Sequence, residues 1–134
     1  MNMPALVVLF AASSVAAQQR SIEPKDVQVF NRSVSALSDG TRKGVRLNEQ
    51  PGEGVAYLKG IEFSNGTIEF DVRGNAWFHV RVVVASPKVS VFVGDAKQPS
   101  LVVTQLSDRT KGLVGLWVGN GSGGDFADLK IIPH

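Results

Sequence analysis

Apolar and polar residues alternate along WFHVRVVVASPKVSVFVG, the segment from Trp77 to Gly94. Aliphatic and aromatic side chains recur at every second position, a period typical of a β-strand that packs one face against a core. In its first half, one face carries Phe78, Val80, Val82 and Val84, and the other carries Trp77, His79 and Arg81. Ser86-Pro87 interrupts the pattern, because proline fixes φ and cannot donate a backbone hydrogen bond. The segment therefore predicts two strands, Trp77–Ala85 and Val89–Gly94, joined by a turn.

Seven other short segments show apolar runs or alternation between turn-forming residues. The predicted strands are Val27–Asn31, Val45–Asn48, Val55–Leu58, Thr67–Arg73, Leu101–Gln105, Leu113–Val118 and Phe126–Ile132. No segment after the amino terminus sustains a helical period, although Asp39–Lys43 or Ser107–Thr110 could form one helical turn. Many short strands separated by Gly, Pro, Asn and Asp are typical of antiparallel sandwiches and jelly rolls. The pattern predicts an all-β antiparallel sandwich.

The amino terminus has a different pattern. Pro4–Ala17 is uncharged, apolar or small throughout, and ends in Val-Ala-Ala, which is typical of a signal-peptide cleavage site. We expect residues 1–17 to be removed, 18–26 to form a polar leader and 27–134 to form one domain; a buried amino-terminal strand or helix is the alternative. The apolar stretch is shorter than the roughly 20 residues of a membrane span, so no stable membrane insertion is expected after cleavage. The predicted location is secreted or periplasmic.

Charge and cysteine content narrow the functional classes. The 134 residues include 14 basic and 12 acidic residues, for a net charge of +2, and the two signs alternate along the chain. Nucleic-acid binding would favour a basic stripe with stacking aromatics, so no nucleic-acid partner is expected. Cysteine is absent, so disulfides cannot stabilise an exported chain. The core must come from burial of apolar side chains alone.

Three segments together resemble a known family. They are Trp77–Asp95, Gly44–Gly74 and Gly112–Ile131, and the first resembles the strand-turn-strand signature of that family. The chain is similar to concanavalin A-like, laminin G-like jelly rolls of exported bacterial proteins, including domains of the 3-keto-disaccharide hydrolase type and family-16 glucanase-like folds. The resemblance covers most of the chain from Gly44 onward, and it implies a carbohydrate-related function.

Two departures from the family pattern affect the prediction. Gly94-Asp95 replaces the expected Asn-Gly or Asp-Gly turn, and Gly74-Asn75 stands where relatives carry a long insertion of several strands. We therefore expect a sandwich reduced in strand number, lacking a central multi-strand segment. An uncovered sheet edge would favour pairing with another chain, so self-association through an edge is predicted.

Glu69 and Asp71 lie two residues apart on one face of a predicted strand. Family-16-like glucanases present their carboxylates in this way, and a retaining hydrolase needs two carboxyl groups about 5–5.5 Å apart. The family pattern has a further glutamate, which is missing here, so the set is incomplete. A solvated polar face is the favoured interpretation, and Glu69 and Asp71 stand as the candidate catalytic residues of the alternative.

The glycine-rich run Gly119–Gly124 formally matches a dinucleotide-binding pattern. The remaining ten residues predict a strand and not the required helix, so no dinucleotide cofactor is expected. Asn120 and Asp125 offer oxygen ligands, which makes calcium an alternative there, although calcium needs six to eight oxygens. No His or Cys spacing indicates another metal.

Trp77, Trp117 and Tyr57 are candidate platforms for stacking a sugar ring. A packing role is favoured for Trp77, and Trp117 adjoins the glycine-rich run. The predicted ligand-binding residues are Trp117, Asn120, Asp125 and Tyr57. The leading functional hypothesis is an exported, non-catalytic domain that binds carbohydrate or a surface polymer. The alternatives are a glycoside hydrolase or 3-keto-disaccharide-cleaving enzyme, and a structural remnant that functions only within an assembly.

Overall fold

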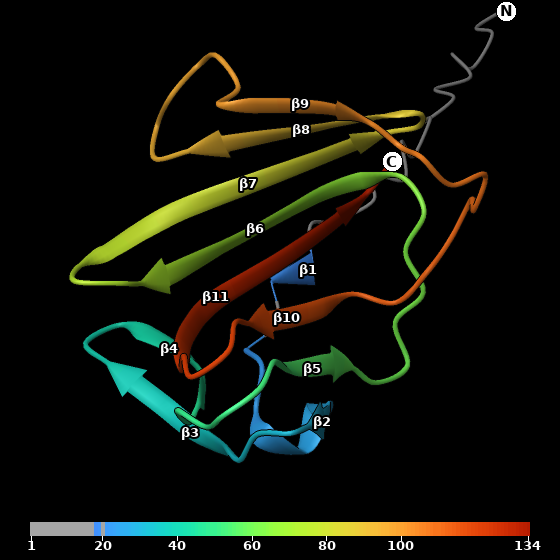
Figure 1. Ribbon diagram of the computed structural model, residues 1–134. Helices are drawn as coiled ribbons and strands as arrows, with labels where there is room; N and C mark the ends of the chain where they lie inside the picture. Colours follow the sequence, from blue (N-terminus) through green and yellow to red (C-terminus); the bar gives the residue numbers. More distant parts are fainter. Residues whose placement is uncertain (1–17, 20) are drawn as a thin grey trace, which may run out of the picture.

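The computed structural model describes residues 18–19 and 21–134. This part of the chain contains eleven β-strands and one 3-10 helix, joined by turns and loops (Figure 1). The predicted signal segment, 1–17, lies outside the described residues. The elements are β1 (Gln18–Gln19), η1 (Pro24–Asp26), β2 (Val27–Phe30), β3 (Val34–Asp39), β4 (Arg42–Leu47), β5 (Gly54–Leu58), β6 (Gly66–Arg73), β7 (Trp77–Ala85), β8 (Lys88–Val93), β9 (Leu101–Thr104), β10 (Gly115–Val118) and β11 (Gly124–Pro133).

The strands form two antiparallel sheets. The larger sheet has the order β3-β4-β11-β6-β7-β8-β9, with β1 pairing to β11, and the smaller has the order β10-β5-β2. The described residues contain no α-helix. This architecture confirms the predicted all-β antiparallel sandwich.

All nine predicted strands are present, with ends that shift by a few residues, but β1 and β3 were missed. Only Leu37 among the six residues of β3 is buried, so the strand carries little hydrophobic alternation. The helical turn considered for Asp39–Lys43 is wrong. Gly40, with φ of 60°, lies in the hairpin turn between β3 and β4, where residues such as glycine reach positive φ without strain.

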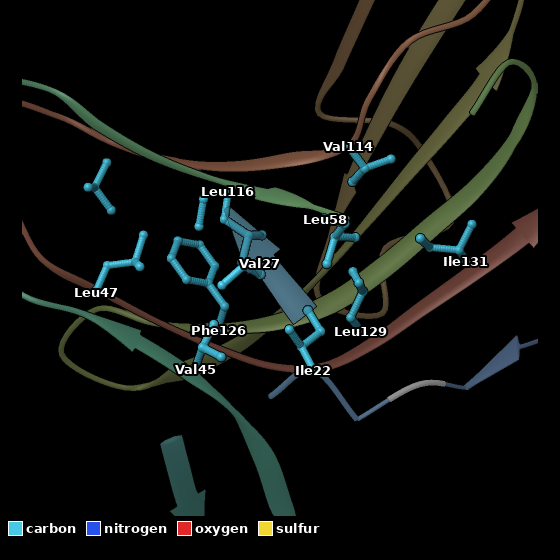
Figure 2. Close-up of a cluster of buried hydrophobic side chains, with 12 residues drawn as sticks. Ile22, Val27, Val45, Leu47, Leu58, Val114, Leu116, Phe126, Leu129 and Ile131 are labelled. Atoms are coloured by element: carbon cyan, nitrogen blue, oxygen red, sulfur yellow. The ribbon is translucent and has the colours of Figure 1, made fainter. Parts of the chain in front are cut away.

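The core lies between the smaller sheet and three strands of the larger one. Strands β2, β5 and β10 contribute Val27, Ala56, Leu58, Leu116 and Val118, and strands β4 and β11 contribute Val45, Leu47, Phe126, Leu129 and Ile131 (Figure 2). The apolar side chains of β6 pack against this cluster. Strands β4, β11 and β6 therefore form the covered half of the larger sheet.

A β-bulge in β11 reverses the phase of its inward side chains. The pairing with β6 shifts between Ala127 and Lys130, and Asp128 has a φ of 52°. Phe126 points into the core before the bulge, and Leu129 and Ile131 do so after it. One extra residue thus keeps both ends of this ten-residue strand in the core.

Residues 18–26 are more than a leader to the domain. Gln18 and Gln19 pair with β11, and Ile22 is 4% exposed within the core. The predicted domain boundary at residue 27 therefore excludes a core residue. Its polar neighbours hid the single apolar residue, because one isoleucine gives no periodic pattern.

Strands β7, β8 and β9 extend the larger sheet beyond the smaller one (Figure 1). Within the described residues, no buried hydrophobic side chain belongs to these three strands. All four residues of β9 are exposed, and β9 forms one edge of the sheet. We call β7, β8 and β9 the uncovered half of the larger sheet.

Candidate functional site

The outer face of the smaller sheet presents two short rows of side chains. Register places Trp117 opposite Val55, and Val55 opposite Phe30, in one row across the three strands. In the neighbouring row, Tyr57 lies between Gly115 and Gln28. The alternate residues of each strand point into the core, so these six positions face outward.

Three of these residues, Phe30, Tyr57 and Trp117, form what we call the aromatic platform. The rings of Phe30 and Tyr57 meet edge to face, with centroids 5.9 Å apart and planes at 76°. The ring of Tyr57 lies over Gly115, where an added Cβ would come within 2.9 Å of it. The absence of a side chain at Gly115 thus lets Tyr57 lie low on the sheet beside Trp117.

The aromatic platform is open to solvent and uncharged. Trp117 is 60% exposed and Phe30 is 52% exposed. The other outward positions are Val55, Gly115 and the exposed amide of Gln28. A large exposed aromatic surface is uncommon on a soluble domain and indicates an interaction site.

A buried arginine supports the loops beside the platform. Arg32 is 8% exposed and donates hydrogen bonds to the carbonyl oxygens of Asn31, Gly52, Gly119 and Ser122. Those carbonyls lie in the loops that follow β2, β4 and β10. The guanidinium, with donors in a rigid fork, therefore ties three connections of the sandwich at one end.

The glycine-rich loop does not bring the calcium candidates together. The side-chain oxygen of Asn120 accepts a hydrogen bond of 2.6 Å from the backbone N–H of Gly52. Asp125 lies on the outer face of the larger sheet, where its carboxylate binds Arg46 and Arg73. Within the described residues there is no group of three or more His, Cys, Asp or Glu side chains placed to hold a metal ion.

Asp125 is the best-bound carboxylate of the described residues. Arg46 donates to it at 2.7 and 3.0 Å, and Arg73 donates at 2.9 Å and through a second nitrogen. The hydrogen bonds from Arg46, followed by those from Arg73, lower the pKa of Asp125, although partial burial opposes this. The same contact raises the pKa of Arg46. The carboxylate of Asp125 is therefore held by two arginines on the outer face of the larger sheet.

Glu69 and Asp71 share the outer face of β6, as predicted. Asp71 accepts a hydrogen bond of 3.1 Å from Arg42, and its other oxygen lies 2.8 Å from Nδ1 of His79. Asp71 is thus paired with the guanidinium of Arg42 and with the imidazole of His79. Glu69 lies on the same face of β6, two residues away. Sequence reasoning treated His79 as a strand residue and missed its contact with Asp71, because the two residues are on different strands.

Trp77 is not a free platform. Its indole N–H donates to Asp39 at 2.8 Å, and the guanidinium carbons of Arg42 and Arg73 lie 5.1 and 4.8 Å from its ring centroid. Cations near the ring compete with a sugar for the same surface. Trp77 therefore contributes to packing on the outer face of the larger sheet.

A cavity of about 280 Å³ opens at the other end of the sandwich. Its inner wall comes from the core residues Ile22, Leu58, Leu129 and Ile131. The loop from Lys59 to Asn65 forms much of its rim. The volume is near the lower limit of ligand pockets, and the wall would suit a small apolar group.

Two of the predicted ligand residues, Trp117 and Tyr57, come together on one surface, and Asn120 and Asp125 lie elsewhere with other partners. Phe30 was missed, because alternation alone does not reveal that its strand pairs with β5.

Comparison with protein-family models, curated proteins and solved structures found no match. No helix among the described residues is long and apolar enough to cross a membrane.

Proposed function

We propose that this chain binds a neutral carbohydrate polymer on the aromatic platform. The observation that carries the proposal is the aromatic platform, in which Trp117 and Phe30 are exposed to solvent on an uncharged sheet face. Trp117 and Phe30 are two strand spacings apart, roughly 10 Å, so both can contact one elongated ligand. An extended partner of this kind requires an open face more than a deep pocket.

Carbohydrate suits this surface better than an acidic or purely apolar ligand. The C–H groups on one side of a pyranose ring carry partial positive charge and pack well on the negative face of an aromatic ring. Gln28, next to Tyr57, has an amide that can donate to and accept from a hydroxyl. No outward position of the smaller sheet is charged, which favours a neutral polymer.

The proposal includes kinship with concanavalin A-like and laminin G-like domains, as an exported protein. Support comes from the antiparallel two-sheet architecture and from the small number of strands in the smaller sheet. A reduced relative of such domains would have lost strands from one layer, which agrees with the uncovered half of the larger sheet.

The test is binding of the full chain to a glycan array and to insoluble neutral polysaccharides. We expect retention that falls at least about tenfold in Trp117→Ala, the usual effect of truncating an aromatic anchor. The matched control is Phe92→Ala, because Phe92 is a partly exposed aromatic residue on the outer face of the larger sheet. Absence of binding to any glycan, or equal effects of the two variants, would contradict the proposal.

A hydrolase acting on carbohydrate is the second candidate function. The specific support is the 2.8 Å contact between Asp71 and Nδ1 of His79, which orients the ring so that Nε2 could accept a proton. Glu69 lies on the same face as a second carboxylate. Turnover of β-glucan or a 3-keto-disaccharide that is lost in both Glu69→Gln and His79→Asn would favour this function, and turnover unchanged in either would exclude that residue.

A further inference from the structure

The inner face of the uncovered half is a continuous apolar surface. Register continues the inward residues of β6 onto the next strands, since Phe70 pairs with Val80, and Val80 pairs with Val93. The face consists of Phe78, Val80, Val82, Val84, Val89, Val91, Val93, Leu101 and Val103. No member is charged, and Leu101 is 53% exposed. We call this surface the β7–β9 face.

We propose that the β7–β9 face packs against the same face of a second copy of this chain. The partner's strands would occupy the layer in which the smaller sheet covers the other half. Twisted sheets pack face to face at an angle of about −30° and a separation of about 10 Å. A two-fold dimer therefore needs only one self-complementary surface, and an uncharged aliphatic face meets that need.

The size of the surface agrees with a modest dimer. Three strands spaced by about 4.8 Å, with about six residues each rising about 3.3 Å, cover on the order of 300 Å² per copy. A patch of this size is comparable to the largest apolar patch of a typical monomer, and such patches are often functional. Mutual packing would bury the face of both copies, on the order of 600 Å² in total, which is below the roughly 1,000 Å² of stable specific interfaces and fits a weak, reversible dimer. We expect a dissociation constant in the micromolar range.

Face-to-face packing differs from pairing through the free edge of β9. Edge pairing would join backbone groups of β9 and would leave the apolar side chains of β7 and β8 in water. Only face packing removes these side chains from water, which is the larger gain because burial of apolar surface contributes about 25 cal/mol per Å².

The experiment is sedimentation velocity on the full chain over micromolar concentrations, with a reversible monomer–dimer equilibrium expected. Leu101→Lys and Val102→Lys form the first matched pair, because these neighbours on β9 are about equally exposed but point to opposite faces. Val91→Lys and Ser90→Lys form a second matched pair on the interior strand β8, because these neighbours also point to opposite faces of the sheet. We expect Leu101→Lys and Val91→Lys to raise the dissociation constant at least about tenfold. Val102→Lys and Ser90→Lys should change it less than about twofold.

Four outcomes would overturn the proposal. Equal weakening by Leu101→Lys and Val102→Lys, with no effect of Val91→Lys, would mean that the edge of β9 forms the contact. A chain that is monomeric at all concentrations and does not bind a hydrophobic dye would mean that another part of the same chain covers the face. A monomer that binds neutral phosphatidylcholine vesicles would mean that lipid does so, and a monomer that binds the dye without vesicles would leave the face uncovered. Circular dichroism of each variant checks that its fold is retained.

Discussion

The two halves of the larger sheet carry the same alternation of residues and differ in what lies across their inner face. On β6, Ile68, Phe70 and Val72 pack against the core under the smaller sheet. On β7, Val80 and Phe78 lie directly opposite the last two of these, yet neither is buried. Alternation therefore specifies which face of a strand is apolar, and the number of strands in the second layer decides how much of that face is covered.

This difference predicts that the covered half supplies most of the free energy of unfolding. Core burial contributes about 25 cal/mol for each Å² of apolar surface removed from water. The uncovered half is held mainly by its strand pairing, which ends at the exposed edge β9. Three comparisons between substitutions, in order of expected effect, test this view.

The largest contrast is between two leucines. Leu47 is 1% exposed in the covered half. Leu47→Ala should lower the unfolding free energy of the protein by about 2–5 kcal/mol, because the change leaves a cavity. Leu101→Ala, in the uncovered half, should lose less than about 1 kcal/mol in the monomer, since the side chain is mostly in water. Urea denaturation, at protein concentrations below the dissociation constant of the dimer, measures the unfolding free energy of both variants. Similar losses in the two variants would mean that the chain itself covers the β7–β9 face.

The same contrast shows how far the sequence could predict the structure. Nine strands and the all-β class follow from alternation and turn residues, which are local signals. The smaller sheet joins β2, β5 and β10 from distant parts of the chain, so the meeting of Phe30, Tyr57 and Trp117 could not be predicted from spacing. The phase change at the bulge in β11 was equally hidden, because a single inserted residue has no pattern of its own.

The candidate site was predicted only in part, for a related reason. Trp117 and Tyr57 were identified as aromatic residues able to stack on a sugar, and Trp117 was preferred because it adjoins the glycine-rich loop. Asp125 was predicted as a ligand residue, and its two arginine partners were not foreseen, because they come from β4 and β6, far away in sequence. Arg32 gave no signal at all, because nothing in Asn-Arg-Ser indicates that its side chain will bind carbonyl groups from three loops.

The second prediction weakens one end of the covered half. Arg32→Met removes the hydrogen bonds by which Arg32 holds together three loops that run between the two sheets. The change should lower the unfolding free energy by about 2 kcal/mol. The unfolding free energy of Arg32→Lys should lie between those of the unmodified chain and Arg32→Met, because a lysine keeps the charge but not the planar fork of donors. Thermal and urea unfolding measure the series.

The matched control for this change is Arg81→Met in the uncovered half. Arg81 lies 4.0 Å from the ring centroid of Phe92, a contact of about 0.5–1 kcal/mol at an exposed site. A loss for Arg81→Met as large as for Arg32→Met would contradict the unequal division of stability between the halves.

The smallest effect concerns the outer face of the covered half, where Arg46 and Arg73 bind Asp125. Because the pKa of Asp125 is lowered below the value of about 3.9 that it has in an unfolded chain, ionised Asp125 stabilises the fold above that pH. This contribution is lost as the pH falls through the lowered pKa. Asp125→Asn should reduce the Tm at neutral pH by about 3–5 °C and should flatten the decrease in Tm as the pH falls below about 4. Asp95→Asn, in the loop after β8, should leave the acid profile unchanged, because Asp95 makes no ion pair within the described residues. If the acid profile of Asp125→Asn instead matched that of the unmodified chain, the two arginines would not stabilise the covered half through this carboxylate.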